Sequence, residues 1–189
     1  MFSVEESGII GKHSVLIYED EKEGTKIQFQ LIKTALSKNE NSIYLTHHEP
    51  GTIKKQMKNF GIDLNYYFSK NLLHIIQIPD FMKDSEGPKK SIKKTMDKIL
   101  TNLKPPFHIV GRFFPDLTTQ DALNAQVDAE QTCQSNFANF NGSFLCFYQL
   151  DKFKKIPREE KQKILQNHHK IIYSPESGNA ISFDSHLIR

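Results

Sequence analysis

The sequence predicts an α/β fold in three layers, with a mostly parallel central sheet flanked by helices. Two observations support this prediction. Short apolar runs alternate with segments of helical periodicity along the 189-residue chain, and no apolar run is long enough to span a membrane. The whole chain is expected to form one domain, residues 1–189, with its core at about residues 13–173. The predicted strands are residues 14–18, 42–46, 72–78, 107–110, 144–149 and 170–173, and residues 180–183 in the tail 174–189 are expected to add an edge strand.

Apolar side chains spaced three and four residues apart predict five helices between these strands. The first lies between the first two strands, and the second spans about residues 51–60. The third has an apolar stripe on one face and five lysines on the rest of its surface, and it ends before Pro105 and Pro106. The fourth is expected at about residues 119–140 and the fifth at residues 158–167.

The composition is that of an ordinary folded protein with a mildly basic charge. Hydrophobic residues make up 38% and charged residues 25% of the chain, which excludes an intrinsically disordered protein. The formal net charge of +3 comes from lysines dispersed among carboxylates, so no nucleic-acid partner is required. Cys133 and Cys146 fit neither a disulfide framework nor a metal-binding Cys pair, and the first eleven residues do not resemble a signal peptide, so a cytoplasmic protein is expected.

The turn after the first predicted strand, residues 19–26, is where a parallel α/β sheet commonly binds a nucleotide. A phosphate-binding loop has the pattern Gly-x-x-x-x-Gly-Lys-Ser/Thr, because glycines let N–H groups surround the phosphates, lysine neutralises them and the hydroxyl binds magnesium. In this chain Glu19 replaces the first glycine, Gly24 retains the second, Thr25 replaces the lysine and Lys26 replaces the hydroxyl. The loop lacks most groups that bind a nucleoside triphosphate, and its four carboxylates would repel one.

Two interpretations of this acidic loop are open. It is either a phosphate loop that has lost its chemistry, or a solvated turn that never bound phosphate and whose carboxylates complement the dipole of the following helix. The degenerate pattern predicts that the chain is not an enzyme, so we expect no catalytic residue and no cofactor.

Several segments between His13 and Tyr173, taken in their order and spacing, resemble the MEDS domain. This is a sensory domain named for methanogen and methylotroph proteins and related to KaiC-like ATPases. The resemblance opens with His13 and an apolar strand that ends in Tyr18-Glu19-Asp20. The later matching positions are Asn39-Glu40-Asn41, Glu49, Gly111, Glu130, Phe137, Leu145-Cys146, Tyr148, Phe153 and His168. The departures are Gln149 and Arg112, where acidic residues are usual, and His169, where proline is usual. Ligand chemistry that depends on the family's usual residues at these positions is therefore not carried over to this chain.

The resemblance implies a RecA/KaiC-like fold without a working Walker motif, used as a sensory or regulatory input. Such domains are often found beside histidine kinases or DNA-binding domains. The leading hypothesis is therefore a stand-alone signalling module that binds a small ligand or a protein partner without ATP hydrolysis. The expected partner is a histidine kinase, a transcription regulator or a second copy of the chain. The alternatives are a divergent nucleotide hydrolase or phosphotransferase that uses Lys26, and a nucleic-acid adaptor that uses the lysines of residues 89–98. Nucleic acid and membranes are not expected partners.

The candidate ligand-binding residues lie at strand ends or belong to the resemblance. The run His47-His48-Glu49 is not expected to bind a metal, because adjacent residues on a strand point in opposite directions, and no metal site is predicted elsewhere. For Glu130, a paired structural carboxylate is favoured over a residue of a functional pocket. His168 is interpreted as a cap of the preceding helix. The crevice candidates are His13, Tyr18, Glu19, Asp20, Thr46, His47, Glu49, Arg112, Glu130 and Tyr148.

Overall fold

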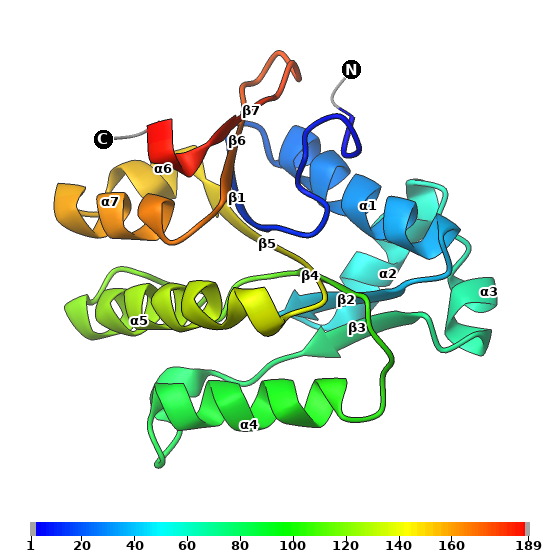
Figure 1. Ribbon diagram of the computed structural model, residues 1–189, viewed down its shortest axis with the longest axis horizontal. Coiled ribbons are helices and arrows are strands. Elements are labelled where there is room, and N and C mark those ends of the chain that lie inside the picture. Colours follow the sequence, from blue (N-terminus) through cyan, green and yellow to red (C-terminus); the bar gives the residue numbers. More distant parts are fainter. Residues whose placement is uncertain (1–2, 188–189) are drawn as a thin grey trace.

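One seven-stranded sheet forms the centre of the computed structural model, which describes residues 3–187 (Figure 1). The strands lie in the order β3-β2-β4-β5-β1-β6-β7, and every pairing is parallel except the one between β6 and β7. The predicted α/β fold with its mostly parallel sheet is therefore confirmed. The strands are β1 (His13–Tyr18), β2 (Asn41–Thr46), β3 (Leu73–Gln77), β4 (Phe107–Val110), β5 (Gly142–Gln149), β6 (Lys170–Ser174) and β7 (Ile181–Asp184).

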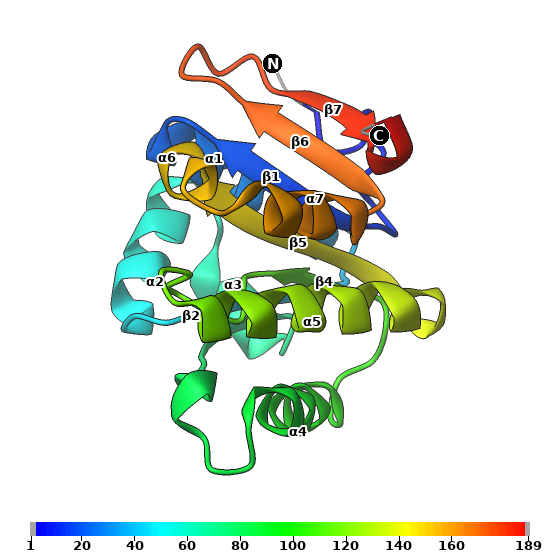
Figure 2. The same ribbon diagram turned by 90° about the vertical axis from the view of Figure 1, so that its left-hand side faces the viewer.

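The helices form a layer on each face of the sheet (Figures 1 and 2). One face is covered by α1 (Glu21–Ser37), α2 (Pro50–Asn59) and α3 (Leu64–Ser69). The other is covered by α4 (Pro88–Leu100), α5 (Gln120–Asn136), α6 (Leu150–Lys154) and α7 (Arg158–Gln166). The sequence did not predict α3 and α6, because helices this short show no periodicity. Among the described residues, no helix has the length and apolar character of a membrane span.

The fourth predicted helix is shorter than expected. It was expected to continue to Phe140, but α5 ends at Asn136 and a short 3-10 turn, Phe137–Asn139, follows it. Further 3-10 turns lie at Phe81–Lys83 and Ser185–Leu187.

Side chains of β1 and β5 alternate between two apolar cores, one on each face of the sheet. Val15 and Cys146 point into the core beneath α5 and α7, whereas Leu16 and Leu145 point into the core beneath α1. His13 lies two positions before Val15 and therefore faces α5. All six residues of β1 are buried, as expected for a strand covered by helices on both sides.

Gly142→Ala is expected to destabilise the fold, because β5 begins in close contact with β4. A Cβ atom on Gly142 would lie 1.8 Å from the carbonyl oxygen of Phe107. Since backbone must move to relieve this overlap, the free energy of unfolding is expected to fall by about 2 kcal/mol or more. Gly51→Ala is the control, because its Cβ meets nothing within 4 Å and alanine favours helix α2. Urea denaturation measures both variants, and equal stabilities would contradict this account of the β4–β5 contact.

Candidate functional site

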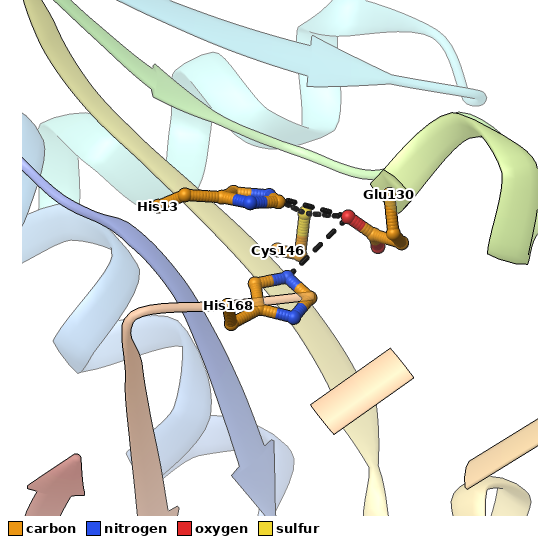
Figure 3. Close-up of side chains that lie close together, drawn as sticks. All are labelled: His13, Glu130, Cys146 and His168. Atoms are coloured by element: carbon orange, nitrogen blue, oxygen red, sulfur yellow. Dashed lines mark hydrogen bonds and ion pairs between the residues drawn. The ribbon is translucent and has the colours of Figure 1, made fainter. Parts of the chain in front are cut away.

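Four side chains of metal-ligating types meet in the core beneath α5 (Figure 3). They are His13 at the start of β1, Cys146 in β5, Glu130 in α5, and His168 in the turn between α7 and β6. Each is at most 1% exposed, and one donor atom from each lies within 4.8 Å of all the others. We call these four residues the buried cluster.

Local structure explains why these positions converge. In the β1–β5 register Val15 pairs with Cys146, so His13 on the same face of β1 lies diagonally across from the thiol. The turn into β6 is fixed beside β1 by a hydrogen bond from the His169 N–H to the His13 carbonyl oxygen at 2.7 Å, which brings His168 alongside. Helix α5 presents Glu130 to this point.

One oxygen of Glu130 is fully hydrogen-bonded. Oε1 accepts a hydrogen bond from the Tyr148 hydroxyl at 2.8 Å and another from the Gln126 amide at 2.6 Å. Tyr148 comes from β5, and Gln126 lies one turn earlier on α5. Both side chains are buried, so these two bonds fix the orientation of the carboxylate.

The other oxygen of Glu130 faces three groups from three separate segments. Oε2 lies 3.2 Å from Nε2 of His13, 3.3 Å from Nε2 of His168 and 3.4 Å from Sγ of Cys146. Sγ of Cys146 is in turn 3.7 Å from Nε2 of His13. The His168 contact does not meet hydrogen-bond geometry, since Nε2 is a buried atom without a hydrogen-bond partner.

The outer nitrogens of the two imidazoles also have partners. Nδ1 of His168 lies 2.7 Å from the carbonyl oxygen of Ile164 in the last turn of α7. His168 therefore caps that helix, and its other nitrogen faces Glu130. Nδ1 of His13 lies 3.2 Å from the Gln134 side-chain oxygen, and the Gln134 amide nitrogen lies 3.1 Å from His169.

The surroundings of Glu130 favour its charged form. Burial raises the pKa of its carboxyl, but the adjacent His168 and His13 outweigh burial and lower the pKa well below its ordinary value. Burial, together with the Glu130 charge, raises the pKa values of the Cys146 thiol and the Tyr148 phenol well above their ordinary values. A single carboxylate thus lies among a neutral thiol, a neutral phenol and two imidazoles.

The structure divides the ten predicted site residues between separate places. His13, Glu130 and Tyr148 come together in or beside the buried cluster. Tyr18, at the other end of β1, is five residues from His13, a distance of about 16 Å along a strand. The remaining candidates follow the carboxyl ends of β1, β2 and β4. One crevice cannot contain all ten.

The acidic loop after β1 is occupied by contacts within the chain. The Glu19 carboxylate accepts hydrogen bonds from the Tyr173 hydroxyl and from the Glu176 N–H, and the first of these lowers the pKa of Glu19 most. Asp20 is the N-cap of α1 and accepts a hydrogen bond from the Glu23 N–H at 2.9 Å. The free N–H groups that usually bind phosphate are therefore partly used by the chain's own carboxylate.

Gly24 has a packing role in this loop. The ring of Tyr18 lies against the first turn of α1, and a Cβ atom on Gly24 would be 2.5 Å from Cγ of that ring. Only glycine allows this approach. The retained glycine is thus explained without a phosphate.

The candidates after β2 and β4 also contact each other. Nε2 of His47 lies 3.1 Å from the Arg112 carbonyl oxygen, and burial lowers the pKa of His47. The Arg112 guanidinium lies over the Phe147 ring at 6.0 Å. Thr46 uses its hydroxyl to accept from the His48 N–H, whereas Glu49 is exposed and precedes α2.

Cys146, His168 and Gln126 were not among the predicted site residues. Gln126 and Gln134 flank Glu130 at four-residue spacing, so a polar stripe on the inward face of α5 was the available signal. Cys146 and Tyr148 lie on the same face of β5. Because side chains alternate along a strand, their two-residue spacing could have shown this from the sequence. Nothing in the sequence placed His168 near them, because that proximity depends on the pairing of β6 with β1.

An apolar cavity of about 1050 Å³ lies between α4 and α5, next to the buried cluster. Phe137 and Phe144 line it, and the ring centroids of both lie within 6 Å of the His13 ring, at 5.7 Å and 5.6 Å. These two phenylalanines, together with Cys133, thus lie between the cavity and the His13 ring. The other apolar lining includes Ile92, Met96, Leu100, Ile109, Phe113 and Phe140.

The fold is that of a KaiC-like protein. The crystal structure of a KaiC-like protein from the hyperthermophilic archaeon Pyrococcus horikoshii is similar to this chain, with a TM-score of 0.62 and 13% sequence identity, and the match covers 87% of this chain and 71% of that one. At this identity the likeness shows the fold alone. No curated protein sequence matches the chain significantly.

The family model of the methanogen/methylotroph, DcmR sensory domain, MEDS, matches residues 12–169. The chain therefore belongs to the MEDS sensory-domain family, and the resemblance inferred from the sequence is confirmed.

Tyr148→Phe is expected to lower the free energy of unfolding by about 1.5–3 kcal/mol, because the hydroxyl is a buried donor to a charged group. The control is Tyr44→Phe, which removes a buried hydroxyl that donates at 2.8 Å to the neutral Gln28 amide and should cost about 0.5–1.5 kcal/mol. Chemical denaturation compares the two. A smaller loss for Tyr148→Phe than for Tyr44→Phe would contradict the assignment of a charged carboxylate at Glu130.

Proposed function

We propose that the chain is a regulatory signalling module that binds a small apolar molecule, does not hydrolyse ATP, and acts on a separate protein. Membership of the MEDS sensory-domain family supports the sensory role. The observation that carries the non-enzymatic part of the proposal is the occupation of the loop after β1 by the chain's own carboxylates.

In phosphate-binding loops, backbone N–H groups at a helix N-terminus surround the phosphates. In this chain the Asp20 carboxylate takes that place at α1, and Glu19 is held next to it by Tyr173 and Glu176. A triphosphate would have to displace both carboxylates and then lie beside their negative charge, with no lysine directed at it by the usual motif. Nucleotide binding is therefore unfavourable.

The cavity between α4 and α5 is the proposed ligand site. Its volume of about 1050 Å³ suits a small organic molecule, and its lining is mostly aromatic and aliphatic. The apolar stripe of α4 is only partly buried, and Ile92 and Met96 from this stripe line the cavity. A small apolar occupant would complete the burial of this stripe.

Helix α4 is the element through which an occupant would act. Its N-terminal end is attached to the preceding loop by a hydrogen bond from Ser91 to Asp84 at 2.9 Å. The lysines of α4 are exposed, and Lys89, Lys90 and Lys93 lie at the rim of the cavity. A ligand that moves α4 relative to α5 would move these lysines. The proposed recipient is a histidine kinase, a transcription regulator or a second copy of the chain, in the cytoplasm, where the free thiols Cys133 and Cys146 stay reduced.

The alternative functions have weaker support. A divergent ATPase or phosphotransferase would use Lys26, but this lysine pairs with Glu23 on the same helix turn. A nucleic-acid adaptor would use the lysines of residues 89–98, of which two pair with Asp97 and Glu86. The lysine of the loop and two of the five lysines of α4 are thus opposed by carboxylates, which weakens the attraction of either site for phosphates.

Isothermal titration of the chain with ATP and magnesium is expected to give no binding heat, and a phosphate-release assay no turnover. The reason is the pair of carboxylates at the α1 N-terminus. Phosphate release that disappears in a Lys26→Ala variant would instead establish the enzymatic alternative and refute this part of the proposal.

Toluene, as a small apolar probe, is expected to raise the thermal unfolding temperature of the chain by binding the folded state alone. Ala129→Phe should abolish this shift, because Ala129 lines the cavity and the added ring would fill part of it. Ala138→Phe is the matched control at an exposed position and should keep the shift. The cavity assignment fails if toluene has no effect on the unmodified chain, or if Ala129→Phe responds as strongly as the control.

A further inference from the structure

Two contacts of the buried cluster, those from the histidine nitrogens to Oε2 of Glu130, are longer than the hydrogen bonds that usually hold a buried carboxylate. Charge-assisted N–H···O bonds measure about 2.7–2.9 Å. The two bonds to Oε1 of Glu130, from the Gln126 amide and the Tyr148 hydroxyl, are short, at 2.6 Å and 2.8 Å. The three contacts at Oε2 are 3.2 Å, 3.3 Å and 3.4 Å, although all the atoms are fully buried. Oε2 is therefore hydrogen-bonded by the Cys146 thiol, whereas neither histidine nitrogen lies at the distance of a charge-assisted hydrogen bond.

His168 gives a second, independent indication. A carbonyl oxygen can only accept, so the 2.7 Å contact with Ile164 places a proton on Nδ1 of His168. In the neutral ring Nε2 then carries a lone pair, which points at the Glu130 carboxylate from 3.3 Å and has no hydrogen-bond partner. A buried lone pair opposite a carboxylate oxygen is unfavourable, so a cation lies between them, either a proton on Nε2 or a metal ion. The contact does not meet hydrogen-bond geometry, which favours the metal ion.

We propose that His13, Glu130, Cys146 and His168 bind one zinc ion in a closed, four-coordinate site. Zinc bonds of about 2.0–2.1 Å to nitrogen and oxygen and about 2.3 Å to sulfur place the donor atoms of a tetrahedron about 3.3–3.6 Å apart. Four of the six edges of the cluster, at 3.2, 3.3, 3.4 and 3.7 Å, are within about 0.1 Å of this range. The other two edges join Nε2 of His168 to the donor atoms of His13 and Cys146. All four donor atoms lie within 4.8 Å of one another.

The charges of this site balance. Two neutral imidazoles, one carboxylate and one thiolate together carry two negative charges, which a divalent ion neutralises in the core. The metal itself deprotonates the thiol, so the high pKa of the free Cys146 thiol does not oppose binding. A core position without net charge has the lowest desolvation cost.

The neighbours of the cluster resemble the outer shell of a metal site. Such shells bond the second nitrogen of each histidine ligand and the second oxygen of each carboxylate ligand. Here Ile164 contacts Nδ1 of His168, Gln134 contacts Nδ1 of His13, and two side chains donate to the second oxygen of Glu130.

The mixed donor set and full burial select the kind of metal and its role. Thiolate and imidazole ligands favour zinc over magnesium or calcium, which require oxygen ligands. Four protein ligands leave no coordination position for water or substrate, so the ion is structural and not catalytic.

The zinc site ties α5 to the sheet. Its ligands come from β1, β5, α5 and the turn before β6, so the ion cross-links the segments behind the apolar cavity. Phe137 and Phe144 lie between the His13 ring and the cavity. Helix α5 would then be the fixed wall of the cavity and α4 the movable one. The metal site does not depend on the proposed sensory role.

The test uses the full chain without an affinity tag, unfolded in denaturant with a chelator and refolded with zinc chloride or cobalt chloride. After desalting, elemental analysis is expected to find an equimolar amount of zinc, and the cobalt form is expected to show thiolate-to-cobalt charge-transfer absorption and tetrahedral d–d bands. Zinc refolding should also raise the thermal unfolding temperature relative to refolding with chelator. Absence of retained zinc, or a cobalt form without the thiolate band, overturns the proposal, and neither result depends on any variant folding.

Paired variants test the ligand set. Cys146→Ser is expected to lose the thiolate band and the retained zinc, whereas Cys133→Ser, at the other cysteine, should keep both. His168→Asn should lose the zinc-dependent rise in unfolding temperature, and His48→Asn, at an exposed histidine, should keep it. Loss of the thiolate band in Cys133→Ser instead of Cys146→Ser would overturn the assignment of the thiol ligand.

Discussion

The fully buried carboxylate of Glu130 is the constraint on which the α5 face of this protein depends. A buried charge costs several kcal/mol unless other groups compensate it. One oxygen is satisfied by Tyr148 and Gln126, and the other requires partners from β1, β5 and the turn before β6 at a single point. The position of α5 on the sheet is therefore determined by polar contacts as well as by apolar packing.

The buried cluster does not lie at the edge of the sheet where parallel α/β folds usually bind ligands. At the carboxyl ends of the strands, Glu19 and Asp20 bond within the chain and Arg112 packs over Phe147. The buried cluster lies instead beneath α5, with aromatic rings between the His13 ring and the α4–α5 cavity. The chain thus combines a fold similar to that of a KaiC-like protein with a first loop whose carboxylates bond within the chain.

The sequence predicted the fold well because buried parallel strands are continuous apolar runs and the long helices have clear periodicity. His13, Glu130 and Tyr148 were named as site residues, but in a crevice with Tyr18 and Arg112 that strand geometry does not allow. Cys146 and His168 were not included. The alternation of side chains along a strand tells which face a residue is on, but not which residue of a neighbouring strand lies beside it. That pairing depends on the register between segments more than 120 residues apart in sequence.

The most direct test of this account is a crystal structure of the zinc-refolded chain with anomalous diffraction data collected at the zinc edge. The account predicts one anomalous peak at about 2.0–2.3 Å from Nε2 of His13, Oε2 of Glu130, Sγ of Cys146 and Nε2 of His168. An empty cluster in which Glu130 is held by hydrogen bonds alone would contradict it.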